Sequence, residues 1–292
     1  MTATRWWLGW IAIGGLGLAA CGSTTTISTG GTTPGPTTTL HPTSAKLAKA
    51  LKAWAGFPVD ATPRPLVLVG SRVAGTINGF PNGAAKQAFI QGAFNAPAKL
   101  PAGPSTTDGY PVITATKALG MLESTDAKGP PVPTRLTITT VQLGTGTFVT
   151  DRGDRRLPAW LFSLQGVQGR AAVLAVAANR IFSPPTAGPS PPPGLDSAQL
   201  SHDGRTLTVG FTGAAPGTGP CTANYTLEVG TSRAAVVIGV HKIHHSGGNS
   251  TSGVFCSAVG YSRHATTVLS KPLGPRVLVD AATNTAVEVT RR

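Results

Sequence analysis

Short apolar runs rich in Val, Thr and Ala alternate with turns containing Gly, Pro and Ser from residue 206 to the end of the chain. Side chains branched at Cβ favour extended backbone, whereas glycine and proline favour the turns that join short strands. Seven short strands at this spacing are typical of a β-sandwich. The predicted strands are 206–211, 224–229, 234–243, 254–261, 266–270, 276–280 and 286–290.

Residues 45–182 combine helix-like and strand-like patterns. Leu47, Leu51 and Trp54 recur every three or four residues with lysines between them, which predicts an amphipathic helix at 45–57. With 37 Gly, 25 Pro and only 12% charged residues, the composition favours strands and turns over long helices. We expect a mainly β fold with a few short helices, comprising an α+β or β-rich N-terminal part and an immunoglobulin-like C-terminal β-sandwich. The other predicted elements are helices at 86–94 and 116–123 and strands at 66–70, 136–143, 147–150, 159–164 and 171–177.

Residues 1–20 have the features of a secretory signal peptide. Arg5 lies in a short N-terminal region, and an uncharged apolar stretch, 6–20, follows it and ends in small residues. This stretch is shorter than the roughly 20 apolar residues that cross a membrane as a helix. At its end, the run Leu18-Ala19-Ala20-Cys21 resembles the lipobox of bacterial lipoproteins.

The lipobox resemblance implies that a peptidase cuts before Cys21 and that the Cys21 sulfur carries a diacylglyceryl group. The chemistry needs a thiol, because the thiolate is the nucleophile. Two or more acyl chains attach a protein stably to a membrane, whereas one does not. We therefore expect a lipid anchor of the palmitate type that holds the exported chain at the outer face of the cytoplasmic membrane. The alternative is a conventionally cleaved leader with an incidental cysteine.

Two segments of unusual composition divide the rest of the chain. Residues 21–44 are mostly Thr, Ser, Gly and Pro and cannot form a core, so we expect a disordered tether. Residues 183–194 contain six prolines and are expected to be extended. They are either a linker between an N-terminal domain, 45–182, and a C-terminal domain, 195–292, or a long loop within one domain.

Cys221 and Cys256 both lie in the C-terminal part. An exported protein meets an oxidising environment, which predicts a disulfide between them, with free buried thiols as the alternative. Closing a loop of this length contributes on the order of 4 kcal/mol in the chain-entropy model. No tryptophan lies between the two cysteines, so the immunoglobulin signature is incomplete and only the architecture is expected.

The chain is strongly basic, since 24 Lys and Arg against 11 Asp and Glu give a formal net charge of +13. Such a charge attracts anionic lipid headgroups, wall polymers or nucleic acid without specifying any of them, and it also keeps a protein soluble. No run of Lys and Arg is interleaved with aromatic residues. We therefore do not expect nucleic acid as a partner.

The segment 151–156 is one candidate site. Asp151, Arg152, Asp154 and Arg155 lie in a charged loop just before an apolar strand. Arginines beside both aspartates favour the ionised carboxylates, which are poor acids. The segment is therefore either an ion-paired turn or a loop that binds an anionic ligand such as a wall polymer.

His241, His244 and His245 form the densest group of candidate metal ligands, because imidazoles bind zinc and copper. The residues before His241 are strand-like, and the side chains of a strand alternate between its two faces. His241 and His245 would share a face but lie roughly 13 Å apart at about 3.3 Å per residue, so one metal could join them only across a bend. The alternatives are a copper or zinc site and a solvated strand end.

Four runs of sequence are distinctive: Asp-Arg-Gly at 151–153, Leu-Pro-Ala-Trp-Leu-Phe at 157–162, Gly-Pro-Cys at 219–221 and Pro-Leu-Gly-Pro-Arg-Val-Leu-Val-Asp at 272–280. They resemble segments of uncharacterised secreted lipoproteins of high-GC Gram-positive (actinobacterial) bacteria. The likeness covers most of the mature chain. It implies an exported lipoprotein, and none of its motifs implies a particular chemistry.

Motifs of common enzymes are missing from the sequence. The chain lacks Gly-x-Ser-x-Gly, Ser-x-x-Lys, the phosphate loop Gly-x-x-x-x-Gly-Lys-Ser/Thr and His-Glu-x-x-His. We expect a non-enzymatic module without a cofactor that binds a wall polymer or another envelope protein. The alternative is a cell-envelope hydrolase whose catalytic residues are dispersed along the chain.

Overall fold

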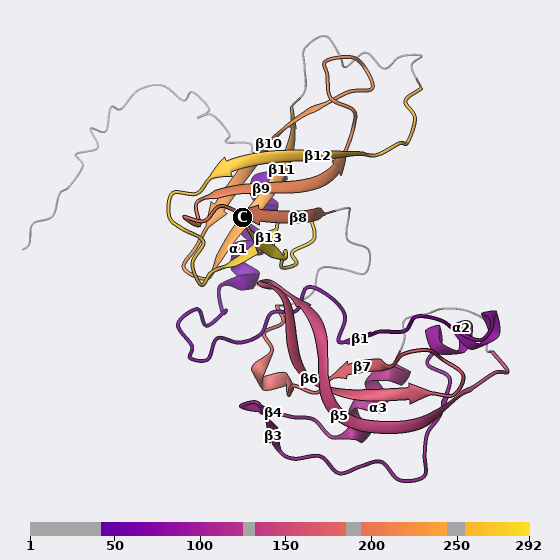
Figure 1. Cartoon of the computed structure of the whole chain (residues 1–292). Helices are drawn as coiled ribbons and strands as arrows, with labels where there is room; N and C mark the ends of the chain where they lie inside the picture. Colours follow the sequence, from indigo (N-terminus) through magenta and orange to yellow (C-terminus); the bar gives the residue numbers. More distant parts are fainter. Residues whose placement is uncertain (1–41, 125–131, 185–193, 244–254) are drawn as a thin grey trace, which may run out of the picture. The chain divides into compact units, whose positions relative to one another are not determined.

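The computed structural model describes residues 42–124, 132–184, 194–243 and 255–292 (Figure 1). The predicted leader with Cys21, most of the tether and most of the proline-rich segment lie outside these residues, as do His244 and His245. Within the described ranges, no helix is both long and apolar enough to cross a membrane.

A long antiparallel hairpin is the centre of the first sheet. β5 (Leu136–Thr150) and β6 (Gly153–Leu164) pair as far as their connecting turn, where Thr150 lies opposite Gly153. The strands predicted at 136–143 and 147–150 are thus one continuous strand. In the described residues this five-stranded sheet has the order β1-β7-β6-β5-β2, which includes β1 (Val73–Gly75), β7 (Ala171–Leu174) and β2 (Phe94–Asn95).

Two short helices pack on the five-stranded sheet. α2 (Gly83–Ile90) and α3 (Ala115–Glu123) each follow a capping residue, Asn82 and Thr114, whose side chain accepts a hydrogen bond from a backbone N–H of the first turn. Such caps satisfy N–H groups that have no partner within the helix. The buried faces of both helices share a core with the sheet, in which Trp160 of β6 is the largest side chain.

The N-terminal helix belongs to a different core. α1 (Pro42–Trp54) buries Trp54 against β11 (Ala235–Ile243) and β13 (Val277–Asp280), and the Trp54 ring lies 5.5 Å from that of Phe182. The helix that we predicted within the N-terminal domain therefore shares a core with C-terminal strands. The contacts of residues 40–292 join them into one unit, and the division at 183–194 stays a prediction.

The described residues of the C-terminal part form two sheets, and apolar residues from both make one core. β11 is buried on both faces, because Ala235 and Val237 contact the core under α1, while Val236 and Ile238 contact the core between the sheets. This explains why its sequence is continuously apolar rather than alternating. The sheet covered by α1 has the strand order β10-β11-β13, in which β10 is Asn224–Thr231. The other sheet has four strands in the order β12-β9-β8-β14. Its strands are β12 (Tyr261–Val268), β9 (Thr206–Gly213), β8 (Leu195–Leu200) and β14 (Val289–Arg291).

The predicted mainly β fold with a few short helices is confirmed. The immunoglobulin-like arrangement is not confirmed, because each C-terminal sheet contains a parallel pair, β11 with β13 and β8 with β14, whereas immunoglobulin sheets are antiparallel. The strand predicted at 254–261 is irregular over 255–260, and β8 was missed because it directly follows the prolines. The remaining short elements are β3 (Thr106–Thr107), β4 (Tyr110–Pro111) and the 3-10 turn η1 (Ala178–Arg180).

The predicted disulfide is confirmed. Cys221 and Cys256 are bonded, with their Cα atoms 5.4 Å apart. The bond joins the segment before β10 to the segment before β12, and these two strands belong to different sheets. The disulfide therefore links the ends of both C-terminal sheets.

Candidate functional site

The turn between β5 and β6 places two charged residues at the end of the long hairpin. Thr150 closes the turn, since its Oγ1 donates to the Gly153 carbonyl at 2.7 Å and accepts from the Arg152 N–H at 3.2 Å. Gly153 has a φ of +83°, a left-handed conformation that favours glycine. Asp151 and Arg152 therefore lie at fixed positions in the turn.

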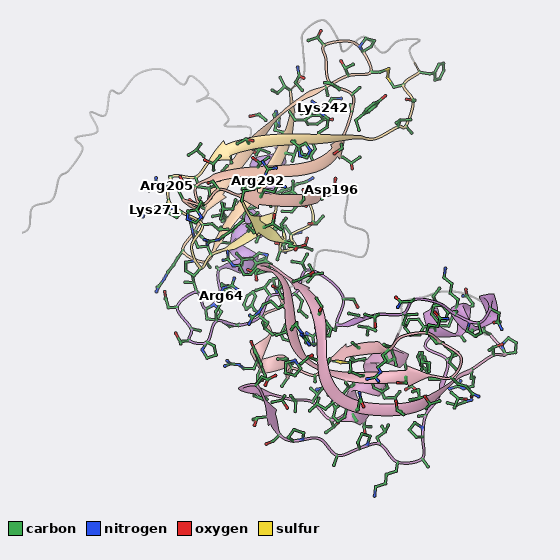
Figure 2. The ribbon with its side chains drawn as sticks, in the orientation of Figure 1. Arg64, Asp196, Arg205, Lys242, Lys271 and Arg292 are labelled. Carbon is green, nitrogen blue, oxygen red and sulfur yellow. A yellow bond between two sulfur atoms is a disulfide. The ribbon has the colours of Figure 1, made fainter. Side chains whose placement is uncertain are left out.

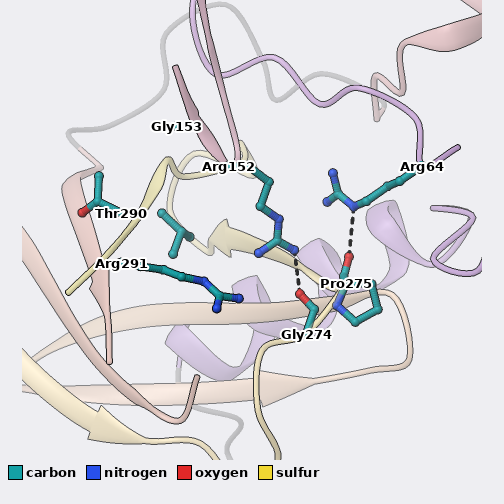
Figure 3. A pocket seen from close by; sticks show the side chains of 8 residues that line it. Arg64, Arg152, Gly153, Gly274, Pro275, Thr290 and Arg291 are labelled. Atoms are coloured by element: carbon teal, nitrogen blue, oxygen red, sulfur yellow. Dashed lines mark hydrogen bonds between the residues drawn. The ribbon is translucent and has the colours of Figure 1, made fainter. Parts of the chain in front are cut away.

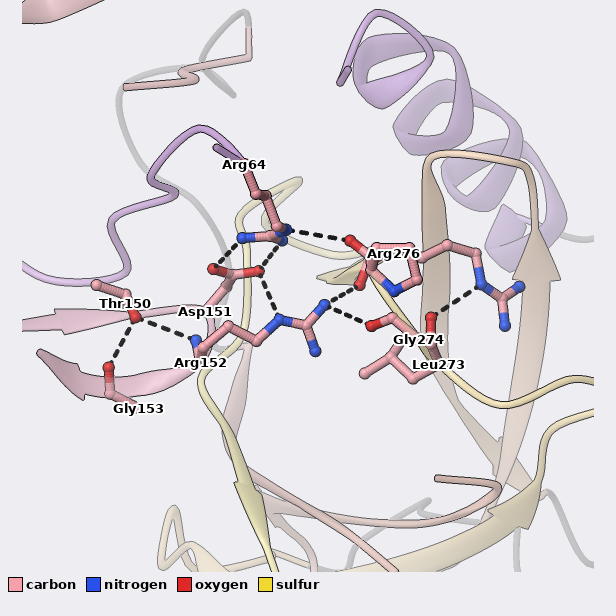
Figure 4. A network of polar contacts seen from close by, with 9 residues as sticks. Arg64, Thr150, Asp151, Arg152, Gly153, Leu273, Gly274 and Arg276 are labelled. Carbon is pink, nitrogen blue, oxygen red and sulfur yellow. Dashed lines mark hydrogen bonds and ion pairs between the residues drawn. The ribbon is translucent and has the colours of Figure 1, made fainter. Parts of the chain in front are cut away.

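Asp151 is buried and holds two arginines (Figure 4). Its Oδ1 accepts a hydrogen bond from Arg64 Nη1 at 3.2 Å, and its Oδ2 accepts one from Arg64 Nη2 at 2.5 Å. Arg152 Nε lies 3.5 Å from the same Oδ2 atom. A carboxylate that bridges two guanidinium groups in this way fixes the orientation of both.

Both arginines also bind backbone carbonyls of one loop between the C-terminal strands. Arg64 Nε donates to the Pro275 carbonyl at 3.2 Å, and Arg152 Nη2 donates to the carbonyls of Gly274 and Arg276 at 2.9 and 2.7 Å. The hairpin turn, the segment of Arg64 and this loop are thereby joined by charge-assisted hydrogen bonds.

The last strand completes the junction. The Asp151 N–H donates to the Val67 carbonyl at 3.0 Å, and the Val289 N–H donates to the Asp151 carbonyl at 3.3 Å. The second bond brings β14, and with it Arg291, beside the hairpin turn. Four segments that are distant in sequence therefore meet at Asp151.

A pocket of about 680 Å³ opens at this junction (Figure 3). Arg64, Arg152 and Arg291 come from three of the segments and place three guanidinium groups around it. In Figure 3 the Arg152 and Arg291 side chains extend from different segments toward the same space. The lining residues are Arg64, Arg152, Gly153, Gly274, Pro275, Val289, Thr290 and Arg291.

The pocket carries a net positive charge. Three guanidinium groups line it, one buried carboxylate, Asp151, pairs with two of them, and a second carboxylate, Glu288, lies beside Gly153. Within the described residues, the Arg291 side chain has no hydrogen bond or ion pair. Burial lowers the pKa of the Arg152 guanidinium; Asp151 opposes this shift, whereas Arg64 and Arg291 add to it. An anion bound here would relieve that repulsion.

The predicted site residues are only partly brought together. Asp151 and Arg152 contribute to the junction, whereas Asp154 and Arg155 are exposed on β6 and do not line the pocket. Arg155 Nη2 lies 3.4 Å from the Tyr110 hydroxyl. Arg64 and Arg291 were not predicted, since a lone arginine between prolines and another near the end of a strand carry no motif.

The histidine cluster is only partly described. His241 lies on β11, where it pairs in register with Thr226 of β10, while His244 and His245 lie outside the described residues. Among the residues that the structure describes, no three His, Cys, Asp or Glu side chains gather in a way that could hold a metal ion. The copper or zinc alternative thus stays a prediction.

Comparison with models of protein families, with curated proteins and with solved structures found no match for this chain.

Proposed function

We propose that the chain is an exported lipoprotein, anchored through Cys21 to the outer face of the cytoplasmic membrane, whose folded part binds an anionic group of a cell-envelope component. The leader, the lipobox-like run before Cys21 and the polar segment after it support the anchored location. The resemblance to secreted actinobacterial lipoproteins is consistent with the same location. The partners are then the membrane, through the lipid, and a wall polymer or envelope protein.

The arginine pocket carries the binding part of this proposal. Arg291 reaches into the pocket without a partner in the described residues, and Arg152 has its Nη1 group left over after its contacts with Asp151 and the loop. Guanidinium groups bind carboxylates and phosphates through paired N–H donors. Because Asp151 already orients two of the three arginines, an anion would meet donors that need little further ordering.

The contacts of Asp151 suit the orientation of arginines in a binding site better than catalysis of hydrolysis. Both of its carboxylate oxygens accept hydrogen bonds from Arg64, and its side chain is only 2% exposed, so a substrate has little access to it. Asp154, the other carboxylate of the hairpin, is exposed and does not line the pocket. We therefore favour a non-enzymatic module over an envelope hydrolase.

Titration with inorganic phosphate tests the binding part. We expect the full chain in a neutral detergent to bind phosphate. Arg291→Gln should weaken this binding about ten-fold, which is the usual contribution of one charge-assisted hydrogen bond to affinity. Arg170→Gln removes an exposed arginine outside the pocket and should change binding less than two-fold, a ratio within the ordinary range for surface substitutions. Equal binding by wild type and Arg291→Gln would contradict the proposal.

The mass of the mature protein tests the anchor. We expect the wild type to begin at Cys21 and to carry acyl chains, and Cys21→Ser to remain unprocessed and without lipid. A wild-type protein without acyl chains, or a Cys21→Ser variant that is processed and membrane-bound like the wild type, would contradict this part.

A further inference from the structure

A second basic pocket lies on the other side of the loop that the two arginines bind. Its volume is about 520 Å³, and Pro275 lines both pockets. Lys271, Arg276 and Arg233 supply its positive charges, and Asp60 is its carboxylate. The loop 271–276 therefore separates two neighbouring pockets that are each rich in cations.

The cations of the second pocket differ in how far they are already bound within the protein. Arg233 forms an ion pair with Asp60, and Arg276 donates from Nη2 to the carbonyls of Lys271 and Pro272 at 3.0 and 2.6 Å. In the described part of the chain, the Lys271 side chain has no such partner. Lys271 is thus the cation of this pocket with most freedom to bind a ligand.

A further cation, Arg205, extends the basic surface at Lys271. Arg205 Nη1 donates to the Ser270 carbonyl at 3.2 Å, and Figure 2 shows the labelled Arg205 and Lys271 close together. Asp203 is the nearby carboxylate, and it already accepts hydrogen bonds from the Ser201 hydroxyl and the Arg205 N–H at 2.5 and 2.9 Å. The cationic surface therefore continues beyond a single pocket.

We propose that the two pockets bind successive groups of one linear polymer that carries repeated phosphate groups, with the loop 271–276 between two bound groups. The proposal rests on the proposed function, because its first subsite is the arginine pocket. A single small anion can occupy one pocket only, whereas a polymer gains the second contact within the same molecule, at a high effective concentration.

The chemistry of the donors favours phosphate over carboxylate. Arg64, Arg152 and Arg291 approach the first pocket from three separate segments, and a tetrahedral phosphate offers oxygens in several directions, whereas a carboxylate offers two oxygens in one plane. Lysine binds phosphate as a point charge, and arginine binds it through paired donors. The two pockets together provide both kinds of contact.

The loop is held in one shape before any ligand binds. Arg276 Nε donates to the Leu273 carbonyl at 3.2 Å, and Arg152 and Arg64 bind the loop from the opposite side. Pro272 and Pro275 restrict its backbone further. The spacing of the two pockets is therefore fixed, and it selects polymers whose anionic groups repeat at a matching distance.

Three probes on the full chain in neutral detergent test the inference: inorganic phosphate, glycerol phosphate, which has the chemistry of a lipid headgroup, and linear polyphosphate. We expect polyphosphate to bind about 100-fold more tightly than either single group, the lower end of the usual gain from linked contacts. Lys271→Gln should reduce polyphosphate affinity about ten-fold and leave phosphate affinity unchanged. Arg291→Gln should weaken both, and Arg170→Gln is the control for loss of one exposed charge.

The outcomes separate this inference from the proposed function. If phosphate binds and depends on Arg291, but polyphosphate binds no more tightly or Lys271→Gln behaves like Arg170→Gln, the two-pocket inference is overturned and the proposed function stands. If Arg291→Gln has no effect on any probe, both fail. Polyglutamate that binds as tightly as polyphosphate would overturn the assignment to phosphate.

Discussion

Replacing Asp151 by Asn should destabilise the fold, because the change removes the charge that holds two arginines together. The Asp151 side chain is 2% exposed, while those of Arg64 and Arg152 are 24% and 27% exposed. Removing one partner of a buried ion pair costs about 3–5 kcal/mol. Water reaches both arginines here and screens their charge, so we expect a smaller loss of about 2–3 kcal/mol in the free energy of unfolding.

Urea and thermal unfolding of the full chain at neutral pH measure this loss. For a unit of this size, each 1 kcal/mol lowers Tm by about 2–4 °C, so Asp151→Asn should melt about 4–12 °C below wild type. Asp154→Asn is the matched control, since Asp154 is an exposed carboxylate of the same hairpin. Its free energy of unfolding should stay within about 0.5 kcal/mol of wild type.

A double variant checks that the loss comes from the ion pair. Arg64→Gln/Asp151→Asn should lose clearly less than the sum of the two single changes, because each single change already breaks the same contact. Additive losses, or an Asp151→Asn variant as stable as wild type, would refute the assignment of Asp151 as the centre of the junction.

Three further predictions concern charge and covalent structure. Glu288→Gln should strengthen phosphate binding about two- to five-fold at low salt, because the change removes the repulsion between Glu288 and phosphate. At high salt this repulsion is already screened, so the affinity should not change; titrations at two salt concentrations measure this. Cys221→Ser/Cys256→Ser should lose about 2–4 kcal/mol in urea unfolding, and a reducing agent should lower the stability of wild type alone. Two hydrogen bonds hold the pKa of Asp203 below its usual range: mainly the one from the Ser201 hydroxyl, and to a lesser extent the one from the Arg205 N–H. This carboxylate therefore stabilises the fold above its unfolded pKa of about 3.9, and the contribution is lost as pH falls through the folded value. Below about pH 4, the urea concentration at the unfolding midpoint should fall less steeply with pH for Asp203→Asn than for wild type. Parallel pH profiles of the two proteins would contradict this.

The strands could be predicted because their signal is local. Alternation, branched side chains and turn residues act over a few positions, so β9, β10, β11 and β13 lie close to their predicted places. The pairing of these strands could not be predicted, since each sheet joins segments that are distant in sequence through backbone hydrogen bonds. The parallel pairs, which leave the immunoglobulin-like arrangement unconfirmed, have no local signature.

The place of α1 shows the same limit. Its spacing of apolar residues predicted a buried face but gave no partner for that face. Trp54 Nε1 donates to the Asn284 carbonyl at 3.4 Å, across 230 positions of sequence. Burial against a remote strand is decided by shape and by the available apolar surface, which a periodic pattern does not specify.

The candidate site was half visible in the sequence. The run Asp151-Arg152-Gly153 predicted an ion-paired turn or a ligand-binding loop, and in the structure Asp151 is ion-paired while Arg152 also lines the pocket. Arg64 lies 87 positions before Asp151, and β14 lies far after it. An ion pair between such positions follows from the fold, so only the fold could reveal that the Arg64 segment and β14 belong to the site.

The two carboxylates near the pocket should act in opposite ways on an anionic ligand. Glu288 repels the ligand, and the described residues give it no ion pair that would be lost on its removal. Asp151 also carries a negative charge, but two guanidinium groups neutralise it, and its hydrogen bonds hold Arg64 in place. Without Asp151, each arginine would have to be ordered on binding, at about 0.5–1.5 kcal/mol per side chain. Asp151 thus orders arginine side chains before the ligand binds. We infer that its charge raises the affinity of the site for an anion and also stabilises the fold.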